Sequence, residues 1–116
     1  MSMQGCLFCG IAEGTVPAEI VWSDDEFVAF RDIDPQAPVH VLVIPRHHAP
    51  DLAALSATDA AQAGRLLAAV AAVAHGEGLD GGGYRTVLNT GVDGGQTVSH
   101  VHAHVLGGRQ MMWPPG

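Results

Sequence analysis

Residues 100–106 read His-Val-His-Ala-His-Val-Leu, so an imidazole alternates strictly with an apolar side chain. Successive side chains of a β-strand point to opposite faces of its sheet, and residues two apart lie roughly 6.5–7 Å from each other. The pattern therefore predicts a strand over residues 99–106 whose one face carries His100, His102 and His104. The residues of the opposite face are apolar and would pack into the core: Val101, Ala103 and Val105.

The rest of the chain supplies the other elements of a small sheet with helices. Apolar residues at helical spacing predict a short helix over residues 5–13, and the capping residues 56–59 predict the start of a long helix that ends near His75. Short runs of β-branched and aromatic residues predict strands, the first two joined as a hairpin. We therefore expect one domain, residues 1–116, with an α+β fold in which an antiparallel sheet of about five strands carries one long and one short helix. The predicted strands are residues 19–22, 26–31, 40–44, 84–89 and 99–106.

The charge of the chain argues against several classes of partner. Twelve acidic residues stand against five basic ones, and all five are arginines because the chain has no lysine. A nucleic-acid surface, a polybasic membrane patch and the lysine of a phosphate-binding P-loop are therefore not expected. The longest apolar run, residues 66–74, is too short to span a bilayer, and the amino terminus lacks the positive segment of a leader. We expect a cytoplasmic protein that binds neither nucleic acid nor membrane.

The three alternating histidines allow two chemical interpretations. In the first, they share one zinc ion that needs further protein ligands. In the second, a neutral imidazole attacks phosphorus while its neighbours donate hydrogen bonds to the phosphoryl oxygens. The glycine-containing segment 94–97 favours the second, because glycines let backbone N–H groups approach an anion and Thr97 adds a hydroxyl. Further ligands for a metal ion are available at Cys6, Cys9, His47 and His48.

The only two cysteines lie close together as Cys6-x-x-Cys9. From the spacing alone, the pair could be a redox dithiol, half of a zinc site or two small buried side chains. A disulfide between residues so near in sequence would close a very short loop and stabilise little. We therefore do not expect a disulfide framework, and the other three interpretations remain open.

The histidine segment also resembles the signature of a known family, the histidine triad (HIT) superfamily. The likeness extends over almost the entire chain and includes the carboxy-terminal tail. It points to the Hint branch, the histidine triad nucleotide-binding proteins, and implies the fold of that superfamily and a purine nucleotide substrate. The segments that carry this likeness are residues 30–38, 39–46, 93–104 and 106–116.

The resemblance implies a catalytic role for each histidine of the network. His102 is similar in position to the family's nucleophile, which forms a nucleotidyl-histidine intermediate that water then cleaves. His104 would hold the α-phosphate, and His100 and His40 would complete the network. Thr97 would contact the leaving group or protonate it. No metal ion or other cofactor is required for this chemistry.

The resemblance also implies a set of nucleotide contacts. Asp32 stands where the family binds the ribose hydroxyls, and Asn89 lies beside the phosphate. The α-phosphate would be held by the loop residues Gly95, Gln96, Thr97 and Ser99 together with His102 and His104. The residues that resemble the purine pocket, or equally an ordinary core, are Phe8, Ile11, Val16, Phe30, Ile33 and Leu42.

A structural metal ion and a dimer follow from the same resemblance. Related bacterial triad proteins often carry zinc on two cysteines and two histidines, a donor set that suits tetrahedral zinc. The family further implies a homodimer joined through central helices and edge strands, with each tail, including Trp113, reaching the partner's site. The residues at the matching zinc positions are Cys6, Cys9, His48 and His100.

We therefore expect a hydrolase that cleaves purine nucleoside 5′-phosphoramidates, such as adenosine 5′-phosphoramidate, to the nucleoside monophosphate and an amine. One alternative is a dinucleoside polyphosphate hydrolase, which would prefer a phosphate leaving group over an amine. A second is a nucleotide-binding regulatory protein whose hydrolysis is incidental. A third is a pure zinc-binding module, which nucleotide would not stabilise against heat.

Overall fold

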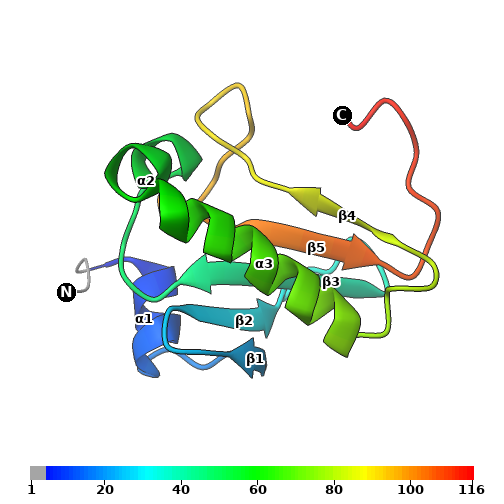
Figure 1. Ribbon diagram of the computed structural model, residues 1–116, viewed down its shortest axis with the longest axis horizontal. Coiled ribbons are helices and arrows are strands. Elements are labelled where there is room, and N and C mark those ends of the chain that lie inside the picture. The colour runs from blue at the N-terminus through cyan, green and yellow to red at the C-terminus, as the bar shows by residue number, and fades with distance from the viewer. Residues whose placement is uncertain (1–4) are drawn as a thin grey trace.

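The computed structural model describes residues 5–116. One five-stranded sheet lies at the centre of this part of the chain, in the order β1-β2-β3-β5-β4, and every neighbouring pair is antiparallel (Figure 1). The arrangement confirms the predicted α+β fold. Within the described residues, no helix has the length and apolar character needed to cross a membrane. The strands are β1 Ile20–Ser23, β2 Phe27–Arg31, β3 Val39–Pro45, β4 Tyr84–Val87 and β5 Ala103–Gly107.

The longest helix, α3 (Ala60–Gly76), lies across one face of the sheet (Figure 1). Its buried residues Leu66, Val70 and Val73 recur at helical spacing and pack on apolar side chains of three strands. This side of the sheet is a closed hydrophobic core, because the strand residues beneath the helix are at most 1% exposed. Those strand residues are Phe27, Ala29, Val41, Val43, Ala103 and Val105.

Two helices, and not the predicted single long one, lie between β3 and β4. The additional helix is α2 (Leu52–Thr58), and Asp59 separates it from α3 with a φ of −156°, which no α-helix continues through. The Asp59 carboxylate accepts the N–H of Gln62 and so caps α3. The sequence analysis identified this capping residue, but it missed the helix that ends there.

The opposite face of the sheet is covered in part by α1 (Leu7–Glu13). Phe8 and Ile11 of this helix pack on strand residues that alternate with those beneath α3. The helix ends at Gly14, whose φ of 82° lies in the left-handed region that glycine adopts readily. The strand residues of this second cluster are Val28, Phe30, Leu42 and Ile44.

The last strand starts later than predicted. β5 begins at Ala103, so the predicted strand over residues 99–106 is wrong at its beginning. The register of β3 and β5 would place Pro45 opposite Val101, and proline has no N–H to donate to a ladder. The alternation of side chains nevertheless continues through this unpaired segment, because Val101 is buried beneath α3 whereas His102 contacts Phe8 on the other face.

Candidate active site

A pocket of about 520 Å³ opens on the face that carries α1. Its walls come from α1 and the loop after it, from β2 and β3, and from the segment that leads into β5. Most of the lining is apolar, and two imidazoles, a carboxylate, a guanidinium and a hydroxyl provide its chemistry. The pocket-lining residues that the sequence analysis assigned are Phe8, Ile11, Val16, Phe30, Asp32, Ile33, Leu42, Thr97, His102 and His104.

The pocket is also lined by residues that the sequence analysis did not assign. Each lies within two residues of an assigned one, and this adjacency is the signal that could have found them. Among them, the Arg31 guanidinium is held by Glu77 at 2.7 Å and by Glu19 at 3.0 Å, so it ties the rim of the pocket to the end of α3. The unassigned lining residues are Leu7, Pro17, Ala18, Arg31 and Val98.

The hydrogen bond of His102 fixes the position of its ring proton. Nδ1 of His102 lies 2.8 Å from the carbonyl oxygen of His100. A carbonyl can only accept, so Nδ1 must carry the hydrogen, and in the neutral ring Nε2 then has a free lone pair. The Phe8 ring packs edge-on against this imidazole with centroids 5.1 Å apart, which holds the ring in place. His102 is therefore a buried imidazole whose unprotonated nitrogen is Nε2.

A chain of hydrogen bonds gives His104 the complementary form. The backbone N–H of Gln36 donates to Nδ1 of His40 at 3.0 Å, so the hydrogen of a neutral His40 lies on Nε2. This Nε2 lies 2.9 Å from Nδ1 of His104 and donates to it, which leaves the hydrogen of His104 on its Nε2. Burial lowers the pKa of His40 below its usual value and that of His104 to about 4, so both rings are neutral at pH 7. His104 therefore presents an N–H donor.

The same hydrogen bonds argue against a metal ion on Asp32, His40 and His104. Their ligating atoms lie within 4.8 Å of one another, and Asp32 Oδ2 is 3.5 Å from Nε2 of His40. A metal ligand needs a bare nitrogen, however, and Nε2 of His40 carries a hydrogen because Gln36 occupies Nδ1. We interpret His40 and His104 as a hydrogen-bonded pair in which His40 orients His104, with the Asp32 carboxylate nearby.

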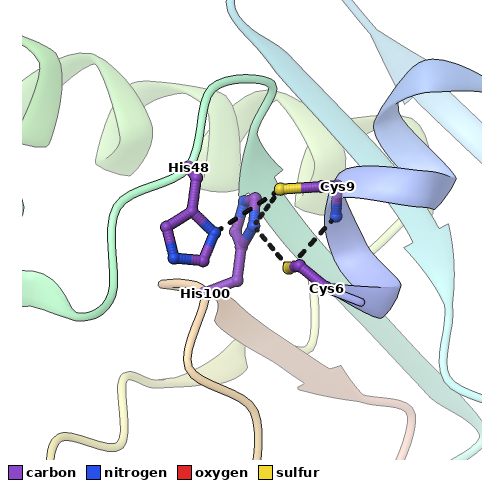
Figure 2. Close-up of side chains that lie close together, drawn as sticks. All are labelled: Cys6, Cys9, His48 and His100. Atoms are coloured by element: carbon purple, nitrogen blue, oxygen red, sulfur yellow. Dashed lines mark hydrogen bonds between the residues drawn. The ribbon is translucent and has the colours of Figure 1, made fainter. Parts of the chain in front are cut away.

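A second group of side chains, which we call the thiol–imidazole cluster, lies beside the pocket. Figure 2 shows the sulfur atoms of Cys6, the N-cap residue of α1, and of Cys9, within α1, facing the two rings. Nδ1 of His100 lies 3.4 Å from Sγ of Cys6 and 3.5 Å from Sγ of Cys9, and Nδ1 of His48 lies 3.5 Å from Sγ of Cys9. All four ligating atoms lie within 4.8 Å of one another. The members of the cluster are Cys6, Cys9, His48 and His100.

The chemistry of the cluster fits a zinc ion. Nε2 of His100 donates to the carbonyl oxygen of Pro45 at 2.9 Å, and burial lowers the pKa of His100 to about 4, so Nδ1 is bare and faces both sulfur atoms. A second-shell carbonyl of this kind orients a ligating histidine. Two sulfurs and two imidazole nitrogens form a four-donor set that tetrahedral zinc accepts. His47, the other candidate from the sequence, is exposed and is not a member of the cluster.

The structure thus divides the three histidines predicted to share one face. His102 and His104 line the pocket, whereas His100 is 0% exposed and belongs to the thiol–imidazole cluster. His100 therefore lies apart from the two pocket histidines, because its ring faces Cys6 at the N-cap of α1 and Cys9 within that helix. Its predicted catalytic role stays a prediction. The same geometry argues against a single metal ion shared by the three alternating rings.

The glycine loop after β4 is held by its own hydrogen bonds. The backbone N–H of Gln96 donates to Gly91 O within the loop. The side-chain amide of Gln96 donates to Pro50 O, outside the loop, at 2.7 Å. The Asn89 amide donates to Gly94 O at 2.7 Å. Of the residues predicted to bind phosphate, Asn89, Gly95, Gln96 and Ser99 do not line the pocket, whereas Thr97 does. The Gln96 N–H, predicted as a phosphate donor, already has an acceptor within the loop.

Comparisons with known proteins agree with one another. The family model described as the HIT domain matches residues 13–111. An uncharacterized HIT-like protein of Synechococcus elongatus is 53% identical over 113 residues, covering 97% of this chain and 98% of that protein. The crystal structure of a HIT family hydrolase from Legionella pneumophila is 47% identical, with a TM-score of 0.92 and coverage of 97% and 100% of the two chains. A histidine triad protein from Clostridium difficile is 36% identical, with a TM-score of 0.92 and 97% coverage of each chain.

Proposed function

This chain belongs to the HIT domain family, and on that premise we propose that it is a hydrolase of the Hint branch that cleaves purine nucleoside 5′-phosphoramidates. The observation that carries the proposal is the hydrogen bond from Nδ1 of His102 to the carbonyl oxygen of His100. This bond leaves a nucleophilic lone pair on Nε2 of a ring that lines the pocket. The Legionella relative is itself named a hydrolase.

In the first step, Nε2 of His102 attacks the α-phosphorus and the P–N bond breaks. The electron pair of that bond goes to the amine nitrogen, which must gain a proton to leave. Thr97, whose hydroxyl belongs to a pocket-lining residue, can relay this proton to the amine from solvent water, and the second step returns a proton to solvent by the same route. The N–H on Nε2 of His104 stabilises the negative charge that gathers on the phosphoryl oxygens. The product of this step is a nucleotidyl-His102 intermediate and a free amine.

In the second step, water attacks the same phosphorus atom and the bond from phosphorus to Nε2 of His102 breaks. The electron pair returns to Nε2, the water proton passes to the relay that protonated the amine, and the nucleoside monophosphate leaves. Dividing the reaction at His102 replaces one difficult displacement with two easier ones. The Nδ1–H of His102 remains on the His100 carbonyl throughout, so the ring positive charge of the intermediate is partly compensated.

The walls of the pocket suit a nucleoside. The rings of Phe8 and Phe30, 5.4 Å apart and edge-to-face, form part of an apolar wall against which a purine can lie. At the rim, the Asp32 carboxylate can accept hydrogen bonds from ribose hydroxyls. We infer that the base enters toward α1 and the phosphate lies beside His102 and His104.

The proposal is tested with His102→Ala on adenosine 5′-phosphoramidate. We expect turnover to fall at least about a thousandfold and no nucleotidyl adduct to be found by mass spectrometry of the intact protein during turnover. The matched control is His47→Ala, which removes an exposed imidazole outside the pocket and should leave turnover unchanged. Undiminished hydrolysis by His102→Ala would refute the proposal.

The choice of leaving group separates the proposed activity from that of a dinucleoside polyphosphate hydrolase. We expect a higher kcat/KM for the phosphoramidate than for diadenosine polyphosphates, because the relay at Thr97 can protonate an amine. A preference for the polyphosphate would favour the alternative enzyme. Tight binding of AMP with negligible turnover of either substrate would favour a regulatory nucleotide-binding protein.

We propose further that the thiol–imidazole cluster holds a structural zinc ion. The support is the bare Nδ1 of His100 facing two sulfur atoms, with Nε2 fixed on Pro45 O. When bound, zinc would cross-link α1 to the segments around residues 48 and 100, and it has no part in the two displacements above. Elemental analysis of protein purified without chelator should find about one zinc per chain.

We also propose a cytoplasmic homodimer. The outer side of α3 is apolar, with Leu67 54% exposed and small residues around it, and β4 is an edge strand. In the tail, Met112 and Trp113 are 72% and 80% exposed, which suits contact with a second copy. Light scattering should give the mass of two chains, and Leu67→Asp should shift the protein toward the monomer.

A further inference from the structure

His100 does not line the pocket, yet its main chain contacts the proposed nucleophile. Its ring lies in the thiol–imidazole cluster, and its carbonyl oxygen accepts the Nδ1–H of His102 at 2.8 Å. We propose that the cluster, when it holds a metal ion, positions His102 by fixing this carbonyl. His100 is then a positioning residue, and the inference rests on the proposed function because it concerns the nucleophile assigned there.

The carbonyl needs such an anchor because regular structure does not hold it. The ladder between β3 and β5 starts at the pair Val43 and Ala103, so residue 100 lies outside it. Two other hydrogen bonds hold the segment: the N–H of Val101 donates to Ala49 O at 2.7 Å, and the His100 ring donates to Pro45 O at 2.9 Å. The ring therefore links its own backbone to β3 through Nε2 and to α1 through Nδ1.

Phe8 provides a second connection between the cluster and the nucleophile. This residue lies between Cys6 and Cys9 in the sequence, and its ring contacts both His100 and His102, with centroids 6.0 and 5.1 Å apart. Any shift of α1 away from the two histidines must therefore change the packing around His102. A metal ion bound by both thiolates would hold the beginning of α1, and with it Phe8, against the nucleophile.

Without an ion, the sulfur atoms contact the rings at the distances of weak hydrogen bonds. The distances from sulfur to nitrogen, 3.4 and 3.5 Å, are those of thiol hydrogen bonds, and cysteine is a weak donor. We expect the His100 ring and its carbonyl to sample other positions in the metal-free protein. Whenever the carbonyl moves away, the proton of neutral His102 can transfer to Nε2, which removes the nucleophilic lone pair.

The experiment follows the tautomer of His102 by ¹⁵N NMR of histidine-labelled protein at about pH 8.5, which is about two units above the ordinary pKa of an imidazole. The ring nitrogens are assigned with His102→Gln, and spectra are compared with zinc bound and after chelation. With zinc, we expect a single tautomer with the hydrogen on Nδ1 and slow exchange of that hydrogen. After chelation, we expect a mixture of both tautomers and at least about tenfold faster exchange of the Nδ1 hydrogen.

Two variants at neighbouring histidines control for a general disturbance of the structure by substitution. His48→Ala removes one ligand from the cluster, whereas His47→Ala removes an adjacent exposed imidazole that is not a ligand. At the zinc concentration used for the wild type, we expect His48→Ala to show the tautomer mixture and fast Nδ1 hydrogen exchange of the chelated wild type. His47→Ala should show the single tautomer and slow exchange of the zinc-loaded wild type. If His48→Ala does not fold, zinc titration into chelated wild-type protein gives the same comparison without a substitution.

The outcome distinguishes this inference from the proposed function. A single Nδ1–H tautomer of His102 in both the loaded and the chelated protein would overturn the positioning role, whatever the activity. Conversely, His102→Ala tests the function without reference to metal. If both proposals hold, chelation should lower kcat in proportion to the fraction of His102 that loses its Nδ1–H tautomer, and readdition of zinc should restore it.

Discussion

His100 and His104 lie four residues apart, and their rings belong to the same side of the chain, yet the structure gives them different partners. Burial lowers the pKa of each ring to about 4, and both have a bare Nδ1. For His100 this nitrogen faces the sulfur atoms of Cys6 and Cys9, and for His104 it faces the N–H of His40. Burial makes both imidazoles neutral, and the group that meets Nδ1 decides whether the residue suits metal ligation or hydrogen-bond donation.

The rings of His100 and His104 are held by hydrogen bonds at different nitrogens. Nε2 of His100 is held by a backbone carbonyl, so the ring offers Nδ1 to a metal. His104 is held at Nδ1 by His40, so the ring offers the hydrogen of Nε2 to a substrate. His102 lies between them and is fixed at Nδ1 by the carbonyl of His100. We call His100 the ligand end of this segment and His104 its substrate end. If metal binding at His100 and substrate binding at His104 are independent, the following results are expected.

The largest effect is expected for His104→Ala. Loss of a preorganised donor to the phosphoryl oxygens should lower kcat on adenosine 5′-phosphoramidate by about 10²–10³-fold. The zinc content should remain that of the wild type, because His104 is not a member of the thiol–imidazole cluster. Kinetics and elemental analysis of the same preparation check both statements. Loss of zinc from this variant would show that the two ends are not independent.

Chelation should affect mainly the ligand end. If free zinc stands at about 100 times its dissociation constant, binding stabilises the native state by about 2.7 kcal/mol, which for a domain of this size corresponds to a Tm higher by about 10 °C. A strong chelator should therefore lower Tm by that amount in the wild type and in His104→Ala alike. Differential scanning calorimetry measures this shift. An unchanged Tm after chelation of the wild type would contradict a structural metal ion.

An effect on stability alone, without a change of ligand or metal, should come from acid titration of the substrate end. The pKa of His104 lies near 4 in the folded protein because the ring is buried, whereas the usual value is 6.5. Between these values the unfolded chain binds the proton and the folded protein does not, so stability falls as pH falls from about 6.5 to about 4. Urea unfolding midpoints at the two ends of this range should differ less for His104→Ala than for the wild type. An equal pH dependence would show that His104 is not kept neutral by the fold.

Much of the architecture was predictable because it depends on local patterns. Apolar runs of β-branched residues predicted all five strands, and the alternation around Val101 predicted which side chains enter the core. The late start of β5 was not predictable from residues 99–106 themselves, because it depends on Pro45 of another strand. The break at Asp59 was missed because its strong cap was interpreted only as a beginning.

The candidate site was predictable as a set of residues and not as an arrangement. The family resemblance assigned Asp32, Thr97, His102 and His104, and all four line the pocket. It did not assign the main-chain groups that determine the tautomers, such as the N–H of Gln36, because every residue carries such groups and they leave no mark in the sequence.

The sequence by itself determined the strand pattern, the position of three imidazoles at alternate residues and the presence of two thiols near the amino terminus. Only the tertiary structure decided which nitrogen of each ring carries a hydrogen and which ring meets sulfur. The reason is the distance along the chain: the contacts of His100 with Cys6 and of His104 with His40 join residues 94 and 64 positions apart. A side chain's neighbours at such separations are set by how the sheet and α1 pack, and they give each of these chemically identical side chains its own role.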